Sequence, residues 1–197
     1  MTRRALMASN RISSRTAGRA ALACGTVAYP TVPQEFRMRA NHDEHRASSV
    51  VSDQELSITR LLNAPRELVF KVWTDPRHVM QWWGPQGFHN TACELDLRPG
   101  GRFALQMTGP DGTSYPCTGY YEEIVPPERL VFVGEADDGH PCGAGLPPRA
   151  RVTVTLIDYH GKTELTLHTR FESVAMQQAA LAHGYREGWQ GALQRLA

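Results

Sequence analysis

The sequence predicts an α+β protein in which a curved antiparallel sheet wraps around one long C-terminal helix. From about residue 89 to residue 171, apolar and polar residues alternate with a period of two, which is typical of half-buried strands. Over about residues 174–196 the apolar residues instead recur every three or four positions, at Leu181, Tyr185, Trp189, Leu193 and Leu196. This spacing indicates an uninterrupted amphipathic helix about 34 Å long, enough to cross a curved sheet.

A short strand over residues 55–62 precedes two short helices, and each helix is expected to begin at a proline. Asn63-Ala64-Pro65 introduces the first helix, and Asp75-Pro76 introduces the second, where the aspartate is a good capping residue. The second helix ends at Trp82-Trp83, before Gly84-Pro85. One apolar face of the first helix is expected to contain Leu68, Val69, Val72 and Trp73.

Six further strands follow, the first two of them with a clear period-two pattern. They are expected at residues 89–97, 102–108, 114–125, 129–134, 150–158 and 163–171, separated by turns rich in glycine and proline. The connection over residues 135–149 is long for a compact domain. The sequence leaves open whether this connection is a lid over a pocket or simply a solvent-exposed loop.

The strand and helix pattern places a single domain at residues 54–197. Residues 1–53 are predicted to be a disordered leader, or to reflect a translation start placed too early, with Met38 as an alternative start. Residues 1–40 carry seven arginines and one acid, whereas residues 41–197 carry 14 basic and 19 acidic residues. The body has no basic stripe, so nucleic acid is not an expected partner.

The four cysteines, at positions 24, 93, 117 and 142, lie far apart. This spacing predicts reduced thiols in a cytoplasmic protein rather than a disulfide scaffold or a zinc site. The chain has no stretch of 18 apolar residues, so no membrane span is expected. No metal site and no cofactor are predicted.

Six segments resemble a known family, in the right order along the chain. They are Asn63-Ala64-Pro65-Arg66-Glu67-Leu68-Val69-Phe70, Trp73-Thr74-Asp75-Pro76, Trp82-Trp83-Gly84-Pro85, Leu97-Arg98-Pro99-Gly100-Gly101-Arg102-Phe103, Pro126-Pro127-Glu128-Arg129-Leu130-Val131-Phe132 and Gly184-Tyr185-Arg186-Glu187-Gly188-Trp189. Residues 54–197 thus resemble bacterial single-domain proteins related to the C-terminal domain of the ATPase activator of the ninety-kilodalton heat-shock chaperone. That family lies in the START-like, SRPBCC superfamily. The resemblance implies a helix-grip fold and a cavity that accommodates a ligand.

A stripe of small residues, Ala180, Gly184, Gly188 and Gly191, runs beside the apolar stripe of the terminal helix. Glycine costs about 1 kcal/mol relative to alanine inside a helix. These residues therefore indicate either a helix packed very close to the sheet or space left for a ligand. For the second case we expect a cavity between the helix and the sheet, lined by Trp73, Trp82, Phe103, Tyr121, Phe132, Ala180, His183, Gly184 and Trp189.

The first hypothesis for function is therefore binding of a hydrophobic or aromatic small molecule by a monomer or homodimer. A second is a cyclase, dehydratase or hydrolase. It would use Glu123, turned inward by a β-bulge, or His183 as acid or base. The alternative for Glu122 and Glu123 is that one is exposed and the other pairs with an arginine. A third hypothesis, a cofactor of the chaperone ATPase, follows from the family resemblance.

Overall fold

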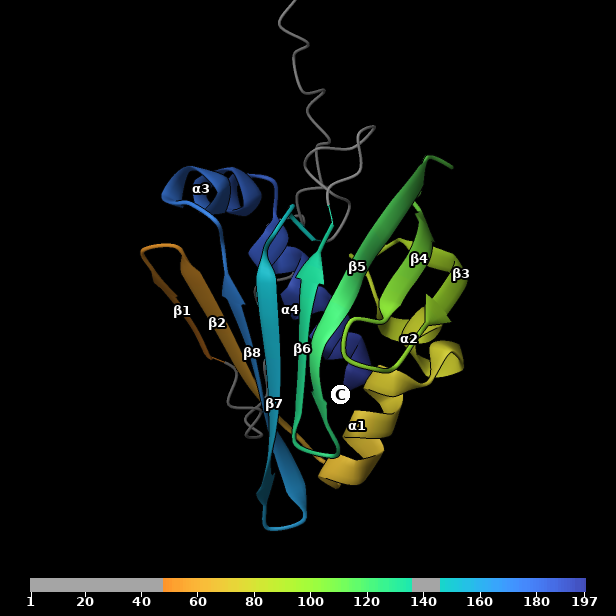
Figure 1. Ribbon diagram of the computed structural model, residues 1–197, viewed down its shortest axis with the longest axis vertical. Helices are drawn as coiled ribbons and strands as arrows, with labels where there is room; N and C mark the ends of the chain where they lie inside the picture. Colours follow the sequence, from red (N-terminus) through yellow and green to blue (C-terminus); the bar gives the residue numbers. More distant parts are fainter. Residues whose placement is uncertain (1–47, 136–145) are drawn as a thin grey trace, which may run out of the picture.

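The computed structural model describes residues 48–135 and 146–197. This part of the chain forms one eight-stranded antiparallel sheet with the strand order β1-β2-β8-β7-β6-β5-β4-β3. The helix α4 lies across one face of this sheet, α2 lies beside β3, α1 lies next to α2 and contacts β7 and β8, and α3 lies over the β1–β2 end (Figure 1). The strands are β1 (Ser48–Ser52), β2 (Glu55–Leu62), β3 (His89–Leu95), β4 (Arg102–Thr108), β5 (Ser114–Val125), β6 (Arg129–Gly134), β7 (Arg151–Tyr159) and β8 (Lys162–Arg170).

Seven of these strands agree with the predicted segments. β2, β5 and β6 have the predicted limits, and β7 and β8 are each shifted by one residue. β1 was not predicted. It pairs with β2 along its whole length, from Ser48–Thr59 to Ser52–Glu55, so the sheet begins within the segment assigned to the leader. Residues 1–47 and most of the predicted 135–149 connection lie outside the described residues.

The two short helices, α1 (Arg66–Thr74) and α2 (Pro76–Trp82), form where the prolines predicted them. The Asp75 carboxylate accepts a hydrogen bond from the Arg77 backbone at 3.0 Å, so it caps α2 as expected. Val69 and Trp73 are buried, but Leu68 is 50% exposed. The prediction that Leu68 shares the buried face is wrong, because α1 buries a narrower stripe than the sequence pattern indicated.

The prediction of an uninterrupted C-terminal helix is also wrong. The segment forms α3 (Val174–Ala182) and α4 (Tyr185–Leu196), separated at His183 and Gly184. Gly184 has φ +81°, a left-handed conformation that ends a helix and that glycine adopts without steric cost. The Gly184 carbonyl then accepts from the Gly188 amide at 2.8 Å and starts α4. Gly184 is therefore required by backbone geometry.

Candidate ligand-binding site

Aromatic side chains fill the space between α4 and the sheet. Trp73 and Trp82 come from α1 and α2, Trp189 comes from α4, and all of them are at least nine-tenths buried. The ring centroids of Trp73 lie 4.6 Å from Trp82 and 6.1 Å from Trp189. Edge-to-face and tilted contacts continue through Trp83, Phe103, Phe132 and Tyr121. We call these seven residues the aromatic cluster.

The aromatic cluster leaves little of the cavity that was expected between helix and sheet. A void lined by Trp73, Trp83, Phe103, Tyr121, Phe132 and neighbouring aliphatic residues has a free volume of about 10 Å³. That volume is at the lower limit for one water molecule. The predicted hollow is thus almost completely packed, because four tryptophans, including the unpredicted Trp83, project into it.

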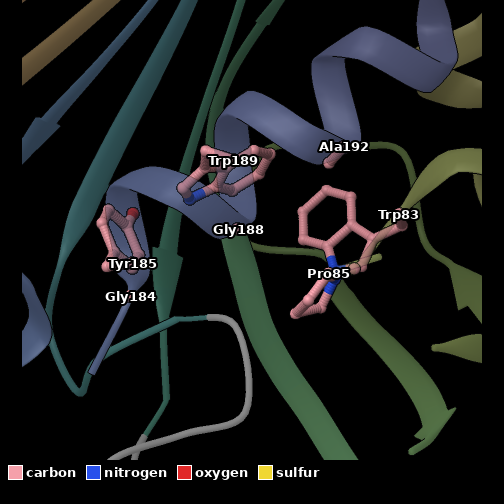
Figure 2. A pocket seen from close by; sticks show the side chains of 8 residues that line it. Trp83, Pro85, Gly184, Tyr185, Gly188, Trp189 and Ala192 are labelled. Atoms are coloured by element: carbon pink, nitrogen blue, oxygen red, sulfur yellow. The ribbon is translucent and has the colours of Figure 1, made fainter. Parts of the chain in front are cut away.

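A larger opening lies on the flank of α4, between this helix and the segment that leads from α2 to β3. It is lined by Trp83, Gly84, Pro85, Gly184, Tyr185, Gly188, Trp189 and Ala192, and its free volume is about 30 Å³, room for about two water molecules. Figure 2 shows Trp83 and Pro85 facing α4 across this opening. In this view Gly188 lies on the helix, with Tyr185 on one side of it and Trp83 and Pro85 on the other. We call it the flank cleft.

The flank cleft is narrow where Gly188 faces Pro85. A Cβ atom built on Gly188 would meet Pro85 Cγ at 3.9 Å and no other atom within 4 Å apart from its chain neighbours and helix backbone. That distance is an ordinary van der Waals contact, so a methyl group bonded to the helix would just reach the opposite wall at this point. The rings of Trp83 and Trp189 meet edge to face beside it, with centroids 5.1 Å apart and planes at 74°.

The wall opposite α4 is shaped by the end of α2. Trp83 ends the helix with its amide bonded to the Val79 carbonyl at 3.0 Å, and Gly84 follows with φ +103°. This conformation is unfavourable for other residues, and a Cβ on Gly84 would also lie 2.9 Å from Met107 Sδ. The Gly84-Pro85 turn therefore presents Trp83 and Pro85 to α4.

One lining residue, Tyr185, carries a hydroxyl that is hydrogen-bonded inside the core. The Tyr185 hydroxyl and Thr169 Oγ1 are hydrogen-bonded at 3.0 Å, both in buried residues. Desolvation raises the pKa of Tyr185, while the bond to Thr169 opposes the rise. The Trp189 Nε1–H lies near the Tyr185 oxygen, but it is buried without a partner in hydrogen-bond geometry. Tyr185 therefore stays a neutral phenol at physiological pH.

Only some of the predicted ligand-binding residues reach the flank cleft. Gly184 and Trp189 line it, whereas Trp73, Phe103, Tyr121 and Phe132 line the small void. Trp82 donates its Nε1–H to the Val72 carbonyl at 3.2 Å, and Ala180 packs against the core from α3. Sequence reasoning did not assign Trp83, Gly84, Pro85, Tyr185, Gly188 and Ala192 to the site. Gly188 belongs to the stripe of small residues that indicated possible space for a ligand, whereas Trp83-Gly84-Pro85 was interpreted as a helix stop.

The β-bulge predicted near Glu123 exists, since the pairing of β5 with β6 shifts register between Tyr121 and Glu123. It does not turn a carboxylate into the core. Glu123 pairs with Arg129, with an N–O distance of 2.5 Å, and Glu122 pairs with Arg151 at 2.6 Å. The bonds from Arg129 lower the pKa of Glu123, the opposite of the raised pKa that the acid–base hypothesis required.

His183 ends α3, and its Nδ1 bonds to the Ala179 carbonyl of the same helix at 2.6 Å. It is not among the residues that line the flank cleft. Among the described lining residues, Tyr185 is the one ionisable side chain. Neither predicted acid–base residue therefore faces this cleft.

The part of the chain that the structure describes contains no group of three or more His, Cys, Asp or Glu side chains placed to hold a metal ion. Its helices are all too short or too polar to cross a membrane. Cys93 and Cys117 are free thiols, and burial raises the pKa of Cys117 to about 12. Cys24 and Cys142 lie outside the described residues.

A curved antiparallel sheet that holds a C-terminal helix against one face, with two short helices after the β2 strand, defines a helix-grip protein of the START-like class. The family model described as "Activator of Hsp90 ATPase homolog 1-like protein" matches residues 63–197. The chain belongs to this family, as the sequence resemblance predicted.

Solved structures agree with this assignment. A protein from Arthrobacter aurescens is 30% identical, with a TM-score of 0.66 over 75% of this chain and 87% of the other. The protein Ms6760 from Mycobacterium smegmatis is 28% identical, with a TM-score of 0.65 over 76% and 92% of the two chains. An AHSA1-like protein from Aeromonas hydrophila, 24% identical with a TM-score of 0.54 over 71% and 91%, shares the fold. No curated protein matches the chain.

Proposed function

We propose that this protein binds a small, flat aromatic molecule in the flank cleft. The observation that carries the proposal is the missing side chain at Gly188, where only a bonded methyl group would reach Pro85. A planar ring, about 3.5 Å thick, needs the least outward movement of Pro85 to lie against Gly188. Trp83 and Trp189 would contact its face and edge, as aromatic pairs prefer.

The chemistry of the lining supports binding rather than catalysis. The lining atoms are predominantly apolar, and burial of apolar surface is the main driving force for a ligand of this kind. The ionisable lining residue, Tyr185, has a raised pKa and is bonded to Thr169. A proton donor or acceptor suited to neutral pH is not among the described lining residues.

The free volume of about 30 Å³ is smaller than a bicyclic ring, whereas pockets for drug-sized ligands enclose roughly 300–1,000 Å³. The ligand therefore enters from the open side of the cleft and moves the Trp83–Pro85 wall outward. The opening on the surface, rather than the packed interior, is the point of access.

The test uses two probes with the same number of carbon atoms and one hydroxyl each, planar 2-naphthol and globular 1-adamantanol. We expect calorimetric titration to give measurable binding of 2-naphthol and at least about tenfold weaker binding of 1-adamantanol. In a thermal unfolding assay, 2-naphthol at about one hundred times its Kd would add about 2.7 kcal/mol to the free energy of unfolding.

Gly188→Ala and Gly191→Ala are the matched variants. Both glycines are in α4, but a methyl group at 188 fills the gap, whereas one at 191 meets no atom within 4 Å. We expect Gly188→Ala to weaken 2-naphthol binding at least about tenfold and Gly191→Ala to leave it unchanged. Equal binding by both variants, or no binding of 2-naphthol and related planar compounds to the wild type, would contradict the proposal.

A further inference from the structure

The side chain of Arg195 joins α4 to the backbone of the opposite wall of the flank cleft. Its Nη2 donates to the Trp82 carbonyl at 2.8 Å and also to the Gly84 carbonyl, and its Nη1 donates to the Pro85 carbonyl at 3.2 Å. One guanidinium thus holds three carbonyls within four consecutive residues. A planar group with donors in a fixed fork suits such an arrangement.

The remaining carbonyl of this segment is held from the other side. Asn90 on β3 donates from Nδ2 to the Trp83 carbonyl at 2.8 Å and to the Met80 carbonyl at 3.1 Å. The Trp82–Pro85 backbone is therefore fixed to the sheet by Asn90 and to α4 by Arg195. Of these two side chains, Arg195 is the one that bridges the walls of the cleft.

The hydrogen bonds of Arg195 to described residues all go to neutral carbonyl oxygens. The side chain is partly withdrawn from water, and this desolvation lowers its pKa. The positions of the three carbonyl acceptors, rather than an opposite charge, therefore hold the Arg195 side chain in place. Its bonds persist only while the wall stays close to α4.

We propose that Arg195 is a positioning residue that sets the width of the flank cleft and thereby makes it selective for flat ligands. This inference rests on the proposed function and deepens it. With the three bonds in place, the wall can move away from Gly188 only slightly, which favours the thinnest ligands. Without them, the wall keeps its bonds to Asn90 and the packing of Trp83, but no hydrogen bond ties the Pro85 end to α4, so that it can separate and thicker ligands enter.

The test compares Arg195→Met with Arg186→Met. Methionine keeps an apolar stem and removes the donors in both variants. Arg186 lies on the same helix, and among the described residues no side-chain hydrogen bond joins it to residues 82–85, whereas Arg195 makes three. A third variant, Arg195→Lys, keeps the charge but replaces the fork with a point donor, and we expect an intermediate result.

The first measurement is amide hydrogen exchange, which needs no ligand. The Trp83 and Phe88 amides bond to the Val79 and Pro85 carbonyls at 3.0 and 3.2 Å and report on the wall. We expect exchange in residues 83–88 to accelerate at least about tenfold in Arg195→Met but not in Arg186→Met, with exchange in the central strands unchanged. Equal exchange in the two variants would show that Arg195 does not hold the wall.

The second measurement is the ratio of the affinities for 2-naphthol and 1-adamantanol. We expect this preference to fall at least about tenfold in Arg195→Met, through tighter binding of 1-adamantanol, and to persist in Arg186→Met. General destabilisation would not reverse a preference between two ligands. If the wild type binds 2-naphthol but Arg195→Met keeps the same ratio, the inference about Arg195 fails alone. If the wild type binds neither probe, the proposed function fails, and the selectivity inferred for Arg195 fails with it.

Discussion

The indole of Trp73 on α1 stacks on the indole of Trp189 on α4, with ring centroids 6.1 Å apart and 14° between the ring planes. The contact joins an early helix to the last one across the space where a cavity was expected. Each indole Nε1–H is buried without a hydrogen-bond partner in the described part of the chain. The stack is therefore held by packing alone, and its apolar contacts outweigh the cost of two unsatisfied donors.

The first prediction concerns this stack. Trp189→Ala removes a side chain that is 6% exposed, and we expect it to lower the free energy of unfolding by about 3–5 kcal/mol, because a cavity remains between α1 and α4. Urea unfolding followed by circular dichroism measures the change. Tyr159→Ala serves as the control, since Tyr159 is 54% exposed and its loss should change stability by no more than about 0.5 kcal/mol. Similar effects of the two substitutions would contradict a packed cluster.

The second prediction concerns the two glycines within α4. Because added methyl groups at Gly188 and Gly191 meet no atom closer than 3.9 Å, both alanine variants escape steric cost and gain helix propensity. We expect each substitution to raise the free energy of unfolding by up to about 1 kcal/mol. Thermal and urea unfolding provide the measurement. A destabilised Gly188→Ala would mean that the helix lies closer to the wall than the flank cleft requires.

The third prediction concerns a glycine in the sheet. An added Cβ on Gly119 of β5 would overlap the Val133 carbonyl and the Phe103 ring. Neither group can retreat, since one is strand backbone and the other belongs to the aromatic cluster. We expect Gly119→Ala to lower the free energy of unfolding by about 1–3 kcal/mol or more. The control is Gly191→Ala, the same chemical change in open space. Stabilities that move together in the two variants would exclude steric overlap as the cause.

The sheet could be predicted from the sequence because its signals are local. The turn residues on either side of them placed β5 and β6 at their observed limits, and a proline after a capping aspartate placed α2. The break between α3 and α4 was missed, since the apolar spacing of Leu181, Tyr185 and Trp189 continues across it. Glycine is compatible with both a helix interior and a left-handed end, so the sequence alone does not distinguish them at Gly184.

The site could be predicted only in part, because its walls come together through tertiary packing. The aromatic residues were identified, yet their positions decide whether they line a cavity or fill it. Trp83 does both, since it belongs to the aromatic cluster and also lines the flank cleft. Arg195 had no sequence signal, because its partners are backbone carbonyls at residues 82–85, and such acceptors are present at every position of a chain.

The last prediction is a pH dependence at the start of α2. Bonds from Arg77 lower the pKa of Asp75 from 3.8 to about 2 in the folded protein. The folded state therefore favours the ionised carboxylate. This contribution to stability is fully present above the unfolded pKa and is lost as the pH falls from about 4 to about 2.

Asp75→Asn keeps a capping oxygen but removes the charge. We expect the difference in unfolding free energy between wild type and Asp75→Asn to be constant near pH 6 and to shrink progressively below about pH 4, as measured by urea unfolding across this range. Arg77→Met should flatten the same profile, because it removes the largest cause of the shift. Parallel profiles for the wild type and Asp75→Asn would mean that the carboxylate titrates alike in the folded and unfolded chains, and that Arg77 does not stabilise its charge.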